Sequence, residues 1–195
     1  MAEETLTKDL ILDAAEAVLR KYGPSKANVS DIARAIGVSH AALYRHYDNK
    51  AALRKAVVDR WLHGVFEPLG AVLAEKKAPD QLLYRWLRSL WDFKRERARK
   101  DPELFAMYAL LVAETEGAVE FHVESLLLQL ASIIESGMSS GVFGCKDARQ
   151  SAFAVFMATS RFHHTAHAPE WETPDAESRF EAVFQLVLNG LLSKS

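Results

Sequence analysis

The sequence predicts an all-α protein. Apolar residues recur three and four positions apart over most of the 195 residues, and no run of alternating Val, Ile and Thr suggests a strand. Glycines and prolines lie mostly where these runs end, as is typical of helix boundaries. With 49% hydrophobic residues, the chain can fill a core. We therefore expect about nine helices in total.

The first helix is expected from about Thr7, as its N-cap, to Tyr22, with Gly23-Pro24 as its stop. Its apolar positions share one face and are expected to point inward: Leu10, Ile11, Ala14, Val18 and Leu19.

Two short helices joined by a tight turn are expected next. Ser30 is the expected N-cap for a helix over Asp31–Ile36, and Gly37 can adopt the left-handed conformation that ends a helix. Ser39 then caps a second helix that extends to about Tyr47. At about 1.5 Å per residue this helix is roughly 13 Å long, comparable with a DNA major groove about 12 Å wide.

The second short helix presents polar and basic side chains outward if Leu43 and Tyr47 turn inward. The side chains then left outside suit a nucleic-acid groove. An arginine could pair with a guanine edge, an alanine could touch a thymine methyl, and tyrosine and histidine could reach phosphates. The residues in question are His40, Ala41, Ala42, Tyr44, Arg45 and His46. Lys50 opens the next helix, for which Asp48 is the expected cap.

Charge supports a polyanion-binding region near the N-terminus. Residues 20–60 hold nine Lys and Arg against three Asp, a local charge of 9 − 3 = +6, whereas the whole chain carries −2. A helical hairpin with a solvated basic face would have the same composition. The turn, the caps and the aromatic and basic second helix favour DNA binding over that alternative.

The remaining helices follow from proline, glycine and periodicity. A long helix is expected from about Asn49 to Lys76, bent or broken near Pro68, because proline removes a helical hydrogen bond. Further helices are expected over Pro79–Lys100, from Asp101-Pro102 to Glu114, and over Gly117–Gly137, Asp147–Ala166 and Asp175–Ser193, with a turn at Ser139–Gly141.

Residues 8–60 resemble the DNA-binding domain of the tetracycline-repressor (TetR) family of bacterial transcriptional regulators. The similarity rests on the apolar-Ala pair Ile32-Ala33, on Gly37, on Leu43-Tyr44 and on the aromatic and histidine run that ends before Lys50. Arg45 replaces a frequent aromatic residue of the family, and Tyr47 replaces a frequent Phe. Because Arg45 stands at this position, the DNA contact that is usual there in the family is not assumed for this chain, and the preferred base can differ.

The resemblance implies a helix-turn-helix regulator that binds a palindromic operator, most often as a repressor released by a small molecule. We accordingly expect a three-helix DNA-binding domain over 1–52 and a larger helical effector-binding and dimerisation domain over 53–195. The resemblance also implies base contacts by His40, Ala41 and Arg45. It implies phosphate contacts by Tyr44, His46 and Lys50, and a contact with the DNA backbone by Ser30. Ser39 is counted with these DNA-binding residues.

Self-association is expected through the last two helices, which carry broad apolar faces that could equally be ordinary core. In the resembled family they pair with their symmetry mates in a four-helix bundle. The candidate interface residues are Phe153, Phe156, Met157, Phe180, Phe184, Val187, Leu188 and Leu191.

Aromatic residues in the middle of the chain are candidates for an effector pocket, although aromatics at helical spacing are usually core residues. The candidates are Trp91, Phe105, Tyr108, Phe121, Phe162 and His163. This region diverges widely in the family, so the effector is not identified by these residues.

Three histidines give an alternative of a different class. His163, His164 and His167 fall within about 100° on the helix expected there, a spacing that suits zinc, with Glu114, Glu116 or His122 as further ligands. A helical metal-binding protein or metalloenzyme would use them. They could instead line a pocket, lie at an interface or titrate between about pH 5 and 8. We favour these last roles and expect no metal.

Other classes have little support in the sequence. Neither a GxSxG elbow nor a GxxxxGK loop is present, so we expect no enzyme and no cofactor. The single Cys145 excludes an intramolecular disulfide and suits a reducing cytoplasm. The first ten residues lack an apolar stretch, so no signal peptide is expected, and the apolar run Leu126–Ile134 is too short for a membrane span.

Overall fold

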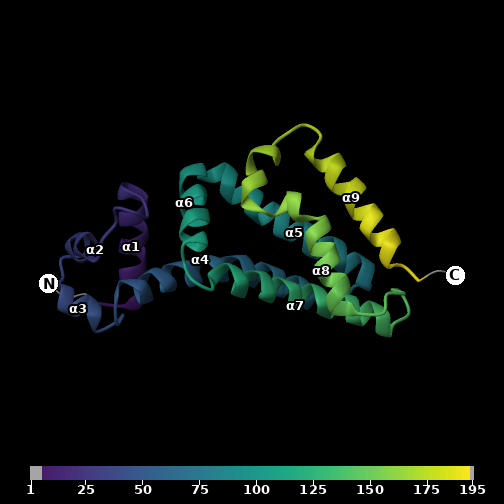
Figure 1. Ribbon diagram of the computed structural model, residues 1–195, viewed down its shortest axis with the longest axis horizontal. Coiled ribbons are helices and arrows are strands. Elements are labelled where there is room, and N and C mark those ends of the chain that lie inside the picture. The colour runs from purple at the N-terminus through teal and green to yellow at the C-terminus, as the bar shows by residue number, and fades with distance from the viewer. Residues whose placement is uncertain (1–5, 194–195) are drawn as a thin grey trace. The chain divides into compact units, whose positions relative to one another are not determined.

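The computed structural model describes residues 6–193, which form nine α-helices and two short 3₁₀ helices and, in this range, no strand (Figure 1). The all-α prediction is confirmed. The helices divide between two compact units: residues up to Leu62 with Asp101–Val119, and His63–Lys100 with the chain from Glu120 onward. The domain boundary expected after residue 52 stays a prediction. By contacts, the first turns of the fourth helix and the whole sixth helix belong to the N-terminal unit.

The N-terminal unit is built on α1 (Lys8–Tyr22), α2 (Val29–Ala35) and α3 (His40–Tyr44), with the start of α4 (Lys50–Leu73) and all of α6 (Pro102–Ala113). α1 forms as expected, because the Thr7 side chain accepts a hydrogen bond from the amide of Leu10 at its start and Gly23, with φ 78°, stands at its end.

Two cap predictions in this unit are wrong by one or two residues. The side chain of Asn28, not that of Ser30, accepts the amide of Asp31 (3.0 Å), so α2 begins at Val29. The side chain of Asn49, not that of Asp48, accepts the amide of Ala52 (2.8 Å). In both cases the asparagine directly before the first helical residue is the cap, because its amide oxygen reaches the free N–H groups of the first turn.

α4 is not broken at Pro68, and the bend considered there as the alternative stays a prediction. Proline removes one hydrogen bond, but Pro68 lies on the exposed side of the helix. The opposite side carries a continuous buried stripe on which packing holds the helix together across the proline: Leu62, Val65, Leu69 and Val72.

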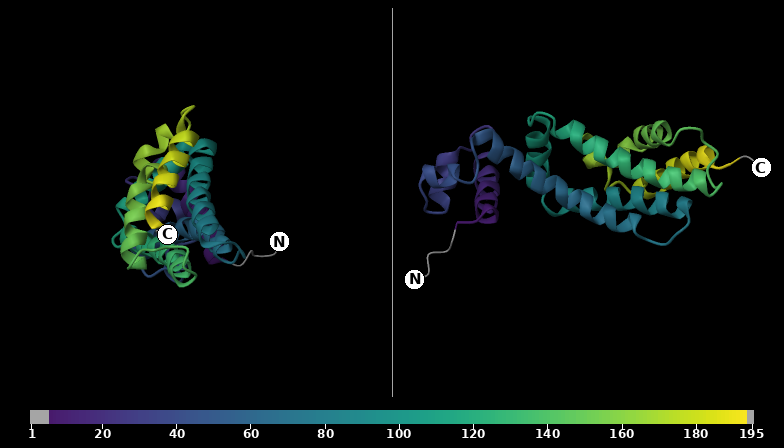
Figure 2. Two further views of the ribbon diagram at one scale, coloured as in Figure 1. Left: turned by 90° about the vertical axis from the view of Figure 1, so that its right-hand side faces the viewer. Right: turned by 90° about the horizontal axis from the view of Figure 1, so that it is seen from below.

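The C-terminal unit contains the rest of α4, α5 (Pro79–Lys100), most of α7 (Ala118–Ser139), α8 (Ala148–Ala158) and α9 (Ala176–Leu191). α8 and α9 pack against each other, as the views in Figure 2 also show. Its core is rich in large side chains: Trp86, Trp91, Trp171 and Phe180 are at most 2% exposed.

The helix expected over Asp147–Ala166 is wrong in its second half. α8 ends at Ala158, and two 3₁₀ helices follow, Ser160–Phe162 and Thr165–Glu170. The hydroxyl of Thr159 donates to the carbonyl oxygen of Val155 (2.9 Å), and the ring of His163 donates to that of Phe156 (3.0 Å). The carbonyl oxygen of Phe156, which would accept the amide of Ser160 in a longer helix, is thus bonded to the His163 side chain instead.

No single helix among residues 6–193 is long and apolar enough to cross a membrane. The sharply bent pair α6 and α7 meets the length and composition test only when both are counted together.

Candidate nucleic-acid interface

The turn between α2 and α3 fixes the direction in which α3 leaves the core. Gly37 has φ 68°, as predicted, its amide donates to the carbonyl of Arg34 (3.3 Å), and the amide of Val38 donates to that of Ala33 (3.0 Å). This pair of bonds is the Schellman arrangement, which satisfies the last carbonyls of a helix. The Ser39 hydroxyl then accepts the amide of Ala42 (3.2 Å), so the predicted cap of α3 is confirmed.

α3 is shorter than predicted and packs through two residues. It spans His40–Tyr44 instead of reaching Tyr47, and Leu43 and Ala42 are 1% and 8% exposed. Leu43 meets the small core expected from Ile32 and Ala33 of α2, which are also buried. Ala42 therefore cannot touch a thymine methyl as we had considered, and only Ala41 is available for that contact.

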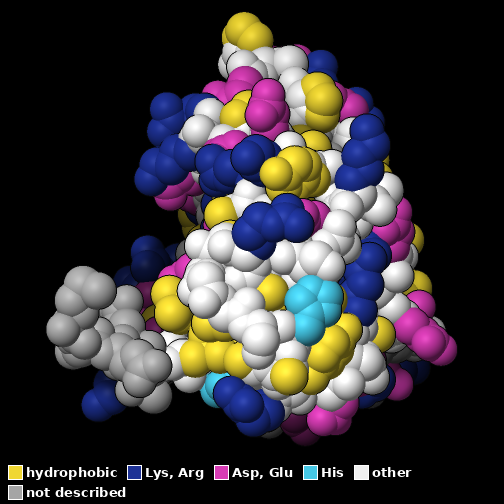
Figure 3. Space-filling view, turned by 90° about the vertical axis from the view of Figure 1, so that its left-hand side faces the viewer, with side chains coloured by type: hydrophobic (Ala, Val, Ile, Leu, Met, Phe, Trp, Pro, Cys, Tyr) yellow, Lys and Arg dark blue, Asp and Glu magenta, His cyan; other side chains and the backbone are white. Residues whose placement is uncertain are grey.

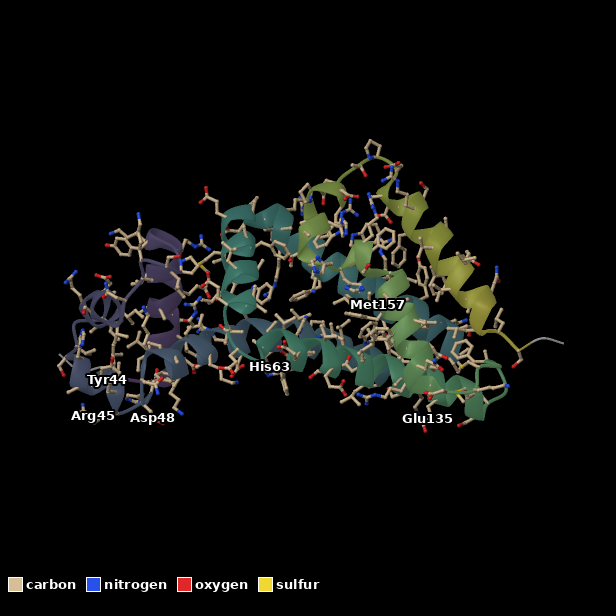
Figure 4. All side chains as sticks on the ribbon, in the orientation of Figure 1. Tyr44, Arg45, Asp48, His63, Glu135 and Met157 are labelled. Atoms are coloured by element: carbon tan, nitrogen blue, oxygen red, sulfur yellow. The ribbon has the colours of Figure 1, made fainter. Side chains whose placement is uncertain are left out.

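The opposite side of α3 is open to solvent. His40, Ala41, Tyr44 and Arg45 are exposed and His46 is half-buried, as expected from the helical spacing. Tyr44 and Arg45 lie together at the end of α3 in Figure 4. In Figure 3, which faces the N-terminal unit, Lys and Arg side chains border a surface that also carries apolar and histidine side chains.

Tyr47 lies half-buried after α3 and ties this segment to α1. The ammonium of Lys8 is 5.9 Å from the centre of its ring. Burial, and secondarily the negative charge of Asp9, raises the pKa of the Tyr47 hydroxyl, which therefore stays neutral. Tyr47 thus turns inward only in part, whereas Leu43 is buried as expected.

Most basic side chains of residues 20–60 are neutralised by acids of the same unit. Arg60 pairs with Asp13 (2.6 Å) and Lys55 with Asp59 (2.7 Å). The other pairs are Arg20 with Asp101, Arg34 with Asp31, and Arg54 with Glu114.

Four cations of this region, Lys21, Lys26, Arg45 and Lys50, form no ion pair with any described residue. Two of them flank the exposed side of α3: Arg45 at its end and Lys50 at the first residue of α4. The free amides at the start of α4 add to the attraction for an anion. Ser30 is exposed in the first turn of α2.

The six candidates for an effector pocket do not lie in one place. Phe105 and Tyr108 belong to the N-terminal unit, where their rings pack on Trp61 at centroid distances of 6.3 and 4.9 Å. Phe121 is 66% exposed. Only the remaining three are buried together in the C-terminal unit: Trp91, Phe162 and His163.

The eight candidates for self-association divide into two groups. Phe153 and Met157 of α8 are 54% and 53% exposed, and Val187 and Leu188 are partly exposed. Phe156, Phe180, Phe184 and Leu191 are buried within their own chain. An additional residue, Leu186 of α9, is 75% exposed and was not predicted, although it lies on the face of α9 opposite Phe184.

The three histidines do not form a metal site, because each has a different partner. His163 is buried and donates to Phe156, His164 accepts the amide of Ala166 (3.3 Å), and His167 pairs with Glu170 (2.9 Å). Their common helix, on which the zinc hypothesis rested, ends before them. In the described part of the chain no three side chains of His, Cys, Asp or Glu are arranged to hold a metal ion.

Among the buried polar residues of the C-terminal unit, the sequence analysis missed Lys94 and considered His122 only as a possible zinc ligand. Lys94 and His122 are 7% and 8% exposed. Both continue buried apolar stripes: Lys94 follows Leu83, Leu87 and Trp91 on α5, and His122 precedes Leu126 by four residues on α7. Helical spacing could therefore have identified them as inward-facing.

Two family models match the chain. Residues 11–57 match the model described as "Bacterial regulatory proteins, tetR family", and residues 79–184 match "Tetracyclin repressor-like, C-terminal domain". The second match alone covers more than half of the chain.

Relatives are most similar in the N-terminal region. An uncharacterized HTH-type transcriptional regulator of Mycobacterium tuberculosis is 46% identical over 78 residues, which are 40% of this chain and 39% of that protein. The HTH-type transcriptional regulator TtgR of Pseudomonas putida is 34% identical over 76 residues, 39% of this chain and 36% of that protein. The chain thus spans about two-fifths of the length of these relatives.

Solved structures share the fold over nearly the whole chain. SmeT, the repressor of the Stenotrophomonas maltophilia multidrug efflux pump SmeDEF, has a TM-score of 0.72 at 16% identity, covering 98% of this chain and 93% of its own. The transcriptional regulator FadR of Bacillus subtilis, in complex with stearoyl-CoA, has a TM-score of 0.71 at 19% identity, covering 95% and 100%. The expected fold is confirmed, and the chain belongs to the TetR family of bacterial regulatory proteins.

Proposed function

We propose that this protein regulates transcription in the bacterial cytoplasm by binding a palindromic DNA operator as a dimer, as a repressor that a small-molecule effector releases. One observation carries the DNA half of this proposal. Of the four cations of residues 20–60 without an acidic partner in the described chain, Arg45 and Lys50 flank the exposed side of α3. Unpaired cations beside an exposed helix are what a phosphate backbone attracts.

Each exposed side chain has a role that its chemistry permits. Arg45 would form a bidentate pair with a guanine edge, and Ala41 would contact a thymine methyl, with His40 as the third base contact. Tyr44, His46 and Lys50 would bind phosphate oxygens, with Ser30 and Ser39 at the edges of the contact. Because α3 spans only His40–Tyr44, residues at both of its ends would contact the DNA.

The dimer half of the proposal is supported by apolar side chains that the chain itself leaves uncovered. Phe153 and Met157 are one turn apart on α8, and Leu186 is exposed on the adjacent helix α9. Large exposed apolar side chains on packed helices are typical of protein interfaces. A two-fold axis here would make the interface self-complementary and give the operator its palindromic form.

The effector half is supported by the composition of the C-terminal unit and by its structural neighbours. FadR of Bacillus subtilis is seen with stearoyl-CoA, so this fold holds an organic ligand in that protein. We place the effector among the buried side chains of this unit, and DNA release would follow if the effector bound the released conformation more tightly.

A selection of bound fragments from random duplex DNA tests the proposal. A palindrome with half-sites about one helical turn apart is expected to emerge. Recovery of unrelated sequences at low ionic strength, with no preference over competitor polymer, would refute the DNA-binding function.

A further inference from the structure

A lysine is buried inside the C-terminal unit without an acidic partner. The side chain of Lys94 on α5 is 7% exposed, and its ammonium donates a hydrogen bond to the carbonyl oxygen of His163 (2.9 Å). Among residues 6–193 it has neither an ion pair nor another hydrogen bond. An ammonium has three N–H donors, so two of them remain unused in a buried environment.

Two neutral histidines lie close to this ammonium. His122 and His163 are 8% and 5% exposed. Burial, with the positive charge of Lys94 as the next cause, lowers the pKa of both rings to about 3. His163 uses one ring nitrogen for Phe156, but Nδ1 of His122 is buried without a hydrogen-bond partner in the described structure.

This arrangement is unfavourable for the protein alone. Burial lowers the pKa of Lys94 to about 8, so the ammonium remains mostly charged at neutral pH. A buried charge without a counter-ion and a buried nitrogen without a partner each reduce stability. A single negative charge placed between them would satisfy both, since Lys94 has donors to spare and a neutral imidazole can donate through Nδ1.

The surroundings of these groups are aromatic. The ring of Phe66 packs edge-on against His122 at 5.1 Å, and Phe156 stacks on His163 at 4.2 Å. Trp91, three residues before Lys94, contacts Phe162 at 5.3 Å. A ligand bound here would meet one positive charge and an otherwise apolar wall.

We propose that Lys94 and His122 bind the carboxylate of the effector, which is a monocarboxylic acid with an apolar body. His163 is a positioning residue, because its carbonyl oxygen orients the ammonium. One cation and neutral imidazoles match one negative charge better than the two charges of a phosphate monoester. The inference rests on the proposed effector-responsive function and adds the chemical class of the effector.

Calorimetric titration with matched pairs of compounds tests the inference. The probes are hexanoate, octanoate, decanoate and 3-phenylpropanoate, each paired with its own primary amide, which has the same shape without the charge. At least one acid is expected to bind, and its amide should bind roughly 10- to 100-fold more weakly, as the loss of charge-assisted hydrogen bonds implies.

Variants assign the preference to these residues. Lys94→Met should bind acid and amide alike, whereas Lys100→Met, which changes an exposed lysine of the same helix, should keep the preference of the parent. His122→Phe should weaken acid binding several-fold while Lys94 still distinguishes acid from amide. Circular dichroism shows whether each variant is folded. If Lys94→Met does not fold, the loss of acid affinity in His122→Phe tests the site instead.

The inference is overturned if no acid binds the parent, if acid and amide bind equally, or if Lys94→Met keeps the preference. DNA binding is measured separately, without acid. If acid binding followed Lys94 but no duplex were bound, the anion site would stand and the proposed regulatory function would fail. If a palindrome were bound but acid and amide did not differ, only the present inference would fail.

Discussion

The hydroxyl of Tyr108 donates a hydrogen bond of 2.6 Å to a carboxylate oxygen of Glu16, which joins α6 to α1 within the N-terminal unit. The same carboxylate lies 3.4 Å from the guanidinium of Arg60 on α4, and the ring of Tyr108 stacks on Trp61. Burial, followed by the hydrogen bond to Glu16, raises the pKa of Tyr108, so the hydroxyl stays protonated as a donor. A residue considered for the effector pocket thus stabilises the unit that carries α3.

Replacing this hydroxyl should weaken the N-terminal unit. Tyr108→Phe keeps the ring and its stacking but leaves the Glu16 carboxylate with one partner fewer. We expect the free energy of unfolding to fall by about 1–2 kcal/mol. Urea denaturation measures the change, and Tyr22→Phe, at a tyrosine that is 42% exposed, is the matched control. Equal stability of Tyr108→Phe and the parent would show that the hydrogen bond is not formed in solution.

Lys94 should give stability a characteristic pH dependence. Its pKa is about 8 in the folded protein against an ordinary value of 10.5, so folding disfavours the charged form. The resulting destabilisation is fully present below pH 8 and disappears as the pH rises toward 10.5, where the unfolded chain also loses the proton. Lys94→Met should therefore gain most relative to the parent near pH 7. That relative gain should shrink by about 3 kcal/mol as the pH rises from about 8 to above 10.5.

Denaturation at several pH values measures this difference for three proteins: the parent, Lys94→Met and the surface variant Lys100→Met. Lys100→Met removes the same charge from the exposed end of α5 and controls for its loss. A difference between Lys94→Met and the parent that did not change with pH would mean that Lys94 is hydrated.

Much of the fold follows from local signals in the sequence. Thr7, Gly37 and Ser39 have the predicted roles, because a cap or a left-handed turn depends on a few neighbouring atoms. Asn28 and Asn49 were missed as caps because each lies within two residues of another residue that can cap a helix, Ser30 or Asp48. Which of the two caps the helix depends on how the helix packs.

Other features depend on tertiary contacts and could not be read from spacing. α8 ends at Ala158, where the His163 side chain bonds to the carbonyl oxygen of Phe156, so the helix on which the histidine cluster was based does not reach the histidines. Exposure likewise separates Phe153 from Phe156, which are three residues apart on one helix. Only the packing of α8 on its neighbours decides which of the two faces a partner.

Arg45 is expected to determine the base at one position of each half-site. Its guanidinium is exposed and has no acidic partner in the described chain, so it is available for a guanine edge. Arg45→Ala should lose about 1–3 kcal/mol of discrimination at that position and little elsewhere. Binding to single-base variants of the selected operator measures this. Arg34→Ala, which removes an arginine paired with Asp31, should leave the preferred bases unchanged.

The exposed faces of α8 and α9 should hold two copies of the chain together. The double variant Phe153→Glu with Met157→Glu places charges where the proposed interface is apolar, and we expect dimerisation to weaken about tenfold or more. Sedimentation velocity over a range of concentrations measures it. Leu128→Glu, at an apolar residue of α7 that is 53% exposed, is the control. Dimerisation of the double variant as strong as that of the parent would place the interface elsewhere.

The salt dependence of operator binding tests the central claim most directly. Lys50 has no acidic partner among the described residues, whereas Lys55, five residues later on α4, pairs with Asp59. Two Lys50 side chains per dimer should each release about one counterion from the DNA. Lys50→Ala should therefore lower the slope of log affinity against log salt by about 2, while Lys55→Ala leaves it near that of the parent. Equal slopes for the parent and both variants would contradict a DNA-binding surface around α3.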